Sequence, residues 1–207
     1  FADNADYRLE ALRVSGTESR FTLNRKARGD ALSLSVPMPG SHNALNAAAA
    51  VAVCTELGVD DEAIVRGLDR FEGIGRRFSV LGNIQWKAGS ALLVDDYGHH
   101  PTELKATIAA ARLAYPGRRL VMAFQPHRYS RTRDCYDEFV DVLSTVDGLA
   151  LLEVYAAGEA VISGADSRSL ARSIRQAGFV DPVLIADNGQ LPARLARLLR
   201  DGDILIM

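Results

Sequence analysis

The chain has 207 residues, 48% of them hydrophobic, which is enough to bury one large core or two smaller ones. Its formal net charge of -2 gives no sign of binding to nucleic acid or to an anionic membrane. No apolar run approaches the roughly 20 residues of a membrane span, and the start carries no signal-peptide pattern. We therefore expect a cytoplasmic protein in which Cys54 and Cys135 stay reduced.

The first third of the chain predicts a small α+β unit. Residues 7–36 alternate apolar and polar positions in short runs, which is typical of a small antiparallel sheet. Residues 43–57 then predict a buried helix, with Ser41 as N-cap and Gly58 as its stop. A second helix is expected from the capping Asp60 to about Phe71.

From about residue 78 the pattern changes to alternating strands and helices. This alternation requires right-handed crossovers and predicts a doubly wound α/β domain with a mostly parallel, Rossmann-like sheet. We expect two domains, 1–78 and 79–207. The expected strands are 91–94, 120–124, 149–154, 183–186 and 204–207, with a further edge strand around 78–86, and the expected helices are 101–115, 132–145, 167–177 and 190–200.

Two short polar clusters lie in or next to the first unit. The first comprises residues 39–43 at the start of the alanine-rich helix, where free N–H groups and the helix dipole favour anions and polar rings. The alternative is a simple N-cap with His42 and Asn43 solvated, which is the better interpretation of this cluster alone. In the second cluster, Arg76 and Arg77 follow two glycines, and they could bind a phosphate or be ordinary surface arginines.

The third cluster follows two consecutive predicted strands. It comprises residues 95–100, which are Asp-Asp-Tyr-Gly-His-His, and residues 125–131, which are Gln-Pro-His-Arg-Tyr-Ser-Arg. A helix cap needs only one polar residue, whereas these loops supply five or six. The pattern therefore favours a functional site over a set of helix caps and loop charges. Parallel strands deliver such residues to one edge of the sheet, and the composition suits an anionic small molecule.

Several sequence motifs are absent. The printed sequence has no phosphate-binding loop of the G-x-x-x-x-G-K-[ST] type and no G-x-G-x-x-G motif. The histidines lack metal-ligand spacing, and His99 and His100 are adjacent and cannot both bind one ion from a single helix face. We therefore expect no metal ligands in this chain.

Taken together and in this order, the three clusters resemble the Mur ligase family of ATP-dependent amide-forming enzymes. The similarity rests on residues 40–46 (Gly-Ser-His-Asn-Ala-Leu-Asn), 76–78 (Arg-Arg-Phe), 95–103 (Asp-Asp-Tyr-Gly-His-His-Pro-Thr-Glu) and 124–132 (Phe-Gln-Pro-His-Arg-Tyr-Ser-Arg-Thr). The form of the last two segments resembles the family members that add L-alanine to UDP-N-acetylmuramate in peptidoglycan precursor synthesis. That reaction proceeds through an acyl phosphate made with ATP and Mg²⁺.

The resemblance also implies a domain organisation. It makes this chain the end of a central ATP-binding domain followed by the C-terminal domain of a three-domain enzyme. The phosphate loop, the magnesium ligands and the UDP-binding domain are then expected upstream of Phe1, and the chain by itself is expected to be inactive. The oligomeric state is left open.

Roles for individual residues follow from the resemblance. It implies that His42, Asn43, Arg77 and Asp96 bind the nucleotide. It further implies that the alanine pocket is bounded by Tyr97, His99, His127 and Arg131, with His99 and Arg131 serving catalysis. Two other functions remain open from the residues alone, namely a non-catalytic module that binds a nucleotide or an amino acid, and a folded interaction domain.

Overall fold

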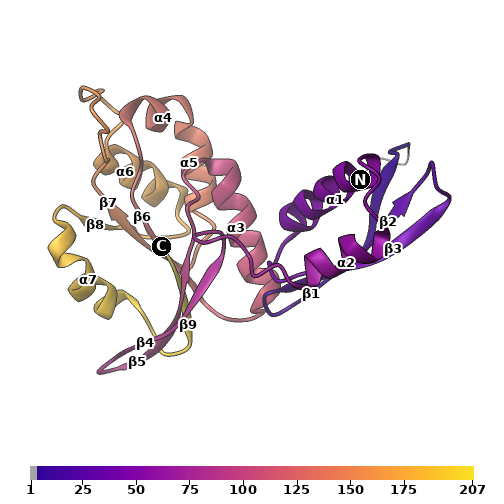
Figure 1. Cartoon of the computed structure of the whole chain (residues 1–207). Coiled ribbons are helices and arrows are strands. Elements are labelled where there is room, and N and C mark those ends of the chain that lie inside the picture. The colour runs from indigo at the N-terminus through magenta and orange to yellow at the C-terminus, as the bar shows by residue number, and fades with distance from the viewer. Residues whose placement is uncertain (1–3) are drawn as a thin grey trace. The chain divides into compact units, whose positions relative to one another are not determined.

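The computed structural model describes residues 4–207 and divides the chain into two compact units (Figure 1). The first ends at Gly75 and the second begins at Arg76, while residues 109–116 are grouped with the first. Among the described residues, no helix is both long and apolar enough to cross a membrane.

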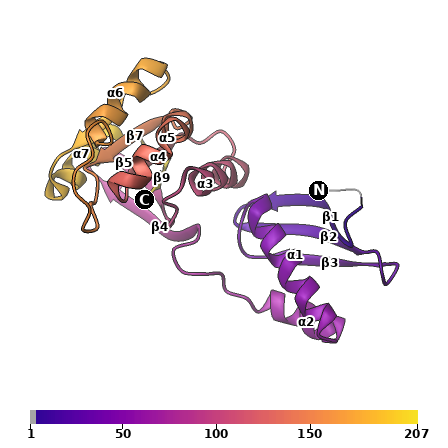
Figure 2. The same ribbon diagram turned by 90° about the horizontal axis from the view of Figure 1, so that it is seen from above.

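The first unit is a three-stranded antiparallel sheet with two helices. Its strands are β1 (Tyr7–Ser15), β2 (Glu18–Arg25) and β3 (Asp30–Val36), hydrogen-bonded in that order. Helix α1 (Ser41–Glu56) lies across the strands, and α2 (Asp61–Asp69) follows it (Figure 2). The alternating strand pattern produces one apolar face, which packs on the alanines of α1. Its core comprises Leu9, Phe21, Leu23, Leu34, Val36, Ala44, Ala47, Ala48, Val51 and Ile64.

The ends of both helices differ in part from the sequence prediction. Ser41 is not the N-cap of α1, because Ala44 N–H already donates to the Gly40 carbonyl, and no side chain caps this helix. Gly40 takes φ 102°, and a Cβ there would lie 2.9 Å from Cε1 of His42, so the position favours glycine. Asp60 does cap α2, but the helix ends at Asp69 and leaves Phe71 partly exposed beyond it.

The second unit contains a six-stranded sheet of order β4-β5-β9-β6-β7-β8. Strand β4 (Ser79–Trp86) is an antiparallel edge strand next to β5 (Gly89–Asp95), and the other neighbours are parallel. The remaining strands are β6 (Leu120–Phe124), β7 (Gly148–Leu152), β8 (Val183–Ile185) and β9 (Asp203–Ile206). The predicted doubly wound, mostly parallel α/β fold is therefore confirmed.

Helices cover both faces of this sheet. Helix α7 (Leu191–Leu198) packs through Leu195 on one face, which includes Val121 and Leu205. On the other face, Phe124 of β6 packs on Phe139 of α5 (Tyr136–Leu143), with 5.5 Å between the ring centroids. The other helices are α3 (Pro101–Ala114), α4 (Tyr129–Asp134) and α6 (Ser167–Ala177), with a short 3₁₀ turn, η1 (Asn188–Gln190), before α7. The single helix predicted for 132–145 is divided at Cys135 into α4 and α5.

The strand order places polar loops side by side. Strand β9, the last in sequence, lies between β5 and β6, so the crossover through α3 passes over an inserted strand, and only the connection from β8 to β9 runs back across the sheet. In open α/β sheets ligands bind outside the carboxyl ends of the strands. The polar clusters after β5 and β6 lie at that edge.

Candidate functional site

A crevice of about 880 Å³ opens at the carboxyl edge of the second unit. It is lined by the loops after β5 and β6 together with the ends of β7 and β9. Its polar lining includes Arg76, Asp96, Tyr97, His99, His127 and Arg131. The two clusters that the sequence analysis assigned to one sheet edge therefore share one cavity.

Asp96 organises the loop that follows β5. One carboxylate oxygen, Oδ2, accepts a hydrogen bond from Phe78 N–H at 2.9 Å, and Oδ1 accepts one from Gly98 N–H at 2.8 Å. A Cβ on Gly98 would lie 2.8 Å from Oδ1 of Asp96, so only glycine allows this close approach. The loop that presents Tyr97 and His99 is thus fixed by hydrogen bonds to charged oxygen, which are stronger than neutral ones.

His99 is oriented by the start of α3. Its Nδ1 lies 3.0 Å from the Tyr97 carbonyl, and a carbonyl can only accept, so Nδ1 carries the proton. In the neutral ring Nε2 then keeps its lone pair. Glu103, the third residue of α3, accepts from the backbone N–H groups of His99 and His100 at 3.0 and 3.1 Å. These bonds and that to Arg77 lower the pKa of Glu103 although its burial opposes them, and they keep the carboxylate ionised.

The loop after β6 contains a strained residue. Arg128 has φ 73° and ψ 135°, a combination that costs a non-glycine residue about 1–3 kcal/mol. Two hydrogen bonds hold this loop against Tyr155, from Arg128 N–H to the Tyr155 carbonyl and from Tyr155 N–H to the Pro126 carbonyl. The Tyr155 ring also stacks on His127 at 5.3 Å. Strain that the surroundings maintain in this way is common at binding sites.

Arg131 lies in this crevice without a carboxylate partner. Its closest polar partners are the Nδ1 and the carbonyl oxygen of His127, at 3.5 and 3.3 Å, and among residues 4–207 no carboxylate lies within 4.0 Å of it. Burial, Arg131 and Arg128 lower the pKa of His127, so this imidazole is neutral at pH 7. The guanidinium of Arg131, which no carboxylate of residues 4–207 neutralises, suits a small anion.

Glu159 supports the same loop from a distant position in the sequence. Its carboxylate accepts from Ser130 N–H at 2.9 Å and from Ser130 Oγ at 2.6 Å, and it lies 3.9 Å from Arg128. It therefore holds the first turn of α4, the helix that carries Arg131. The sequence analysis did not identify Glu159 or Tyr155, because both follow β7 in a stretch without periodicity. For Glu103 a sequence signal did exist, namely an acidic residue two positions after the helix-starting Pro101.

The predicted site residues fall into two groups. Asp96, Tyr97, His99, His127 and Arg131 line the crevice of the second unit. Arg77 belongs to the same unit, but its Nη1 donates to Glu103 Oε1 at 3.3 Å. Its neighbour Arg76 lines the crevice instead, with its guanidinium 4.7 Å from the centroid of the Tyr97 ring and 3.5 Å from Asp95 Oδ2.

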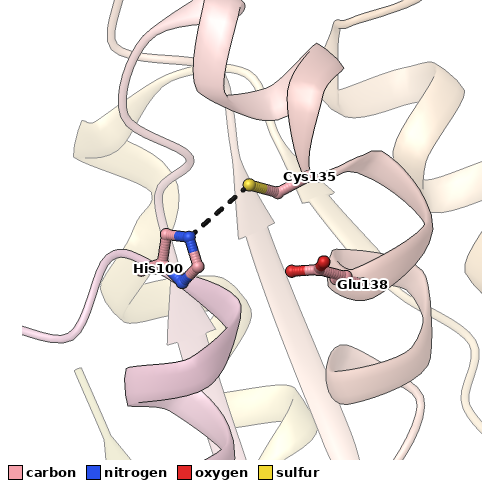
Figure 3. Close-up of side chains that lie close together, drawn as sticks. All are labelled: His100, Cys135 and Glu138. Atoms are coloured by element: carbon pink, nitrogen blue, oxygen red, sulfur yellow. Dashed lines mark hydrogen bonds between the residues drawn. The ribbon is translucent and has the colours of Figure 1, made fainter.

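His42 and Asn43 lie in the first unit, in the first turn of α1. Asn43 is buried, and its Nδ2 donates to the Pro39 carbonyl at 2.9 Å, so part of the amide already serves the fold. No metal ligands were expected in this chain. The second unit nevertheless brings together three side chains of the kinds that bind metals, His100, Cys135 and Glu138 (Figure 3).

Comparisons with known proteins agree with this fold. The family model described as "Mur ligase, glutamate ligase domain" matches residues 76–207, which make up most of the chain. The chain therefore belongs to the Mur ligase family, whose members are ATP-dependent amide ligases.

Solved structures of related fold cover both units. UDP-N-acetylmuramate-alanine ligase MurC from Thermotoga maritima matches with a TM-score of 0.78 and 23% identity, over 99% of this chain and 42% of that one. MurF from Acinetobacter baumannii matches with a TM-score of 0.69 and 20% identity, over 99% and 42%. MurF ligase from Thermotoga maritima in complex with ADP matches with a TM-score of 0.64 and 17% identity, over 99% and 43%. The chain thus spans less than half the length of these proteins.

Proposed function

We propose that this chain acts within a longer MurC-type ligase that joins L-alanine to UDP-N-acetylmuramate at the expense of ATP. In this proposal the first unit is the end of the central ATP-binding domain and the second is the C-terminal domain that binds the amino acid. The observation that carries the proposal is Arg131, a cation without a carboxylate partner among the described residues, in the crevice of the second unit.

Arg131 is suited to the carboxylate of the amino acid. A guanidinium can donate two parallel hydrogen bonds to a carboxylate, and such charge-assisted bonds are about twice as strong as neutral ones. His127, neutral and stacked on Tyr155, adds a wall without a competing charge. A pocket bounded by Tyr97 and these side chains selects a small amino acid by excluding larger ones, at about 1–3 kcal/mol per methylene.

His99 is proposed to accept a proton. The ammonium of alanine must lose a proton before its nitrogen can attack the acyl phosphate of UDP-N-acetylmuramate. The C–N bond then forms as the C–O bond to phosphate breaks, and phosphate leaves. Nε2 of His99 has the lone pair that such a base needs, because Nδ1 is committed to the Tyr97 carbonyl. Arg131 would stabilise the negative charge that concentrates in this step.

The nucleotide contacts are proposed for His42, Asn43, Arg77 and Asp96. Each oxygen of Asp96 accepts one backbone N–H and keeps a second lone pair for a ribose hydroxyl. The guanidinium of Arg77 makes a long contact to Glu103 and keeps further donors for a phosphate. The support from a relative is the ADP complex of MurF.

The magnesium of the ATP step does not fit the one group of potential metal ligands among residues 4–207. That group contains a thiol, whereas magnesium prefers oxygen ligands alone. The printed sequence also contains no phosphate-binding loop. We propose that other parts of the ligase hold the triphosphate and its metal, and we assign no step of phosphate activation to this chain.

The proposal is tested by assaying phosphate release from ATP by the full-length ligase, with UDP-N-acetylmuramate and each of several amino acids. L-Alanine should support release and D-glutamate should not. If another amino acid supports release in place of L-alanine, the chain belongs to a ligase of different specificity. If no amino acid does so while ATP and L-alanine still bind, the non-catalytic binding module is the correct alternative.

A further inference from the structure

The strongest unassigned feature of the second unit is the group formed by His100, Cys135 and Glu138 (Figure 3). His100 ends the loop after β5, Cys135 lies between α4 and α5, and Glu138 lies in the first turn of α5. Their ligand atoms all lie within 4.8 Å of one another. No role in the proposed ligase reaction has been given to any of the three.

The spacing of the imidazole and the thiol matches a zinc site. His100 Nε2 lies 3.6 Å from Cys135 Sγ. With zinc–nitrogen and zinc–sulfur bonds of about 2.0 and 2.3 Å at the tetrahedral angle, the expected separation of the two ligand atoms is about 3.5 Å, close to the separation in this structure. The nitrogen and the sulfur therefore already lie at the separation that one bound ion requires.

The third ligand and the open side also fit. Glu138 is exposed, so its carboxylate can rotate toward an ion between the other two side chains. His100 and Cys135 both line the crevice, which leaves the fourth position of a tetrahedral site open to water. Three protein ligands and one open position are the arrangement of an accessible zinc site.

We propose that His100, Cys135 and Glu138 form a binding site for a zinc-class divalent cation in the wall of the crevice. The thiol excludes magnesium and calcium as the preferred ions, because thiolate ligands select softer metals. On binding, the Sγ–H bond of Cys135 breaks, its proton goes to the solvent and the sulfur bonds to the metal. The proposed site is therefore distinct from the site of the magnesium ion that the ATP step uses. The test of metal binding does not depend on the proposed function.

Two features of the structure limit the affinity. Thr102 N–H donates to Nδ1 of His100 at 3.3 Å, which places the ring proton on Nε2. A metal at Nε2 requires that proton to move to Nδ1, so the long contact to Thr102 must be given up. Burial and the nearby carboxylates of Glu138 and Asp134 raise the pKa of the Cys135 thiol, so the metal competes with a proton for the sulfur.

The test uses Co²⁺ as a spectroscopic substitute for zinc, added to the reduced 207-residue chain. We expect a near-ultraviolet thiolate-to-cobalt charge-transfer band that disappears when Zn²⁺ displaces the cobalt. Cys135→Ser should lose the band, and Cys54→Ser should keep it. Glu138→Gln alters a proposed ligand and should weaken cobalt binding by at least about tenfold, since altering even an outer-shell group costs about tenfold to hundredfold, while Asp137→Asn, one residue earlier on α5, should not.

A second measurement needs no variant. Zn²⁺ should slow the alkylation of Cys135 by iodoacetamide, measured by mass spectrometry of the digested chain, with Cys54 as the internal control. MgCl₂ should protect neither cysteine. A wild-type chain without the cobalt band, a band that persists in Cys135→Ser, or equal alkylation of Cys135 with and without Zn²⁺ would each overturn the proposal.

Discussion

Two arginines, one in each unit, contrast in their partners. Arg25 at the end of β2 is 2% exposed, and its guanidinium forms hydrogen bonds of 2.6–2.8 Å with both carboxylate oxygens of Asp30 and of Asp61. Arg131 in the second unit has only the ring and the carbonyl of His127. Arg25 contributes to the stability of the first unit, because its ion pairs offset the free energy that burying an unpaired charge would cost. A partly buried charge without a counter-ion is instead suited to a ligand that brings one.

The largest expected effect concerns the paired arginine. Arg25→Ala removes the cation shared by Asp30 and Asp61 and leaves only Arg28 beside Asp61. It should lower the free energy of unfolding of the first unit by about 3 kcal/mol, the low end for a broken buried ion pair, because Asp30 and Asp61 are partly exposed. Hydrogen exchange of the β2 and β3 amides measures it. The urea transition seen by the fluorescence of Trp86, the single tryptophan, should stay unchanged because Trp86 belongs to the second unit.

The control for this variant is Arg20→Ala. Arg20 pairs with Glu18 on the surface of the same strand, and an exposed pair contributes roughly 0–1 kcal/mol. If Arg25→Ala and Arg20→Ala change the exchange of the first unit equally, the buried ion pairs do not stabilise it as argued here.

The unpaired arginine should affect substrate binding instead. In the full-length ligase, Arg131→Ala should raise the KM for L-alanine about tenfold to hundredfold, because a charge-assisted hydrogen bond is worth roughly 1.5–3 kcal/mol. The KM for ATP should change little. Steady-state kinetics with each substrate varied in turn measures both values.

The matched control is Arg133→Ala, two residues further along α4. Arg133 already pairs with Asp134 at 2.7 Å, so its removal should leave both KM values unchanged. If Arg131→Ala raises the KM for ATP and leaves that for alanine unaltered, Arg131 does not bind the amino acid.

A smaller effect is expected at Glu159, which positions the loop. Glu159→Gln keeps one acceptor for Ser130 but loses the charge that faces Arg128. Helix caps contribute about 0.5–2 kcal/mol, so we expect the KM for alanine to rise about threefold to tenfold. Glu153→Gln is the control, since the one cation that its carboxylate contacts among residues 4–207 is Arg168, at 3.9 Å. Equal kinetics for the two variants would show that the bonds from Glu159 do not position Arg131.

The sequence predicted the elements of the fold better than their arrangement. Apolar runs such as 120–124 and the capping Asp60 act locally, and the structure contains the expected strand and cap there. The insertion of β9 between β5 and β6 depends on pairing between distant segments, which no local pattern encodes. Ser41 was expected to cap α1 from its residue type alone, whereas the backbone conformation of Gly40 determines where that helix begins.

The candidate site was predictable where polar residues follow a strand directly. Tyr97, His99, His127 and Arg131 come within seven residues of a strand end, so the parallel sheet alone brings them to one edge. The supporting contacts were not predictable in this way. Glu159 reaches Ser130 across 29 residues, and Cys135 reaches His100 across 35, through loops whose course depends on tertiary packing.

The smallest expected effect is a change in the pKa of His127, which tests whether the charge of Arg131 lacks a counter-ion. Burial is the main cause of the lowered pKa of His127, and Arg131 is the next. Arg131→Ala should therefore raise this pKa in the 207-residue chain while leaving it below the ordinary value of about 6.5. An NMR titration of the His127 ring protons measures the shift, and Arg133→Ala should produce none.

The lowered pKa of His127 also makes stability depend on pH. The folded chain protonates His127 less readily than the unfolded chain, so the second unit loses stability as the pH falls below about 6.5, and Arg131→Ala should lose less. An unchanged His127 pKa in Arg131→Ala would mean that another group or the solvent already neutralises Arg131, which would remove its contrast with Arg25.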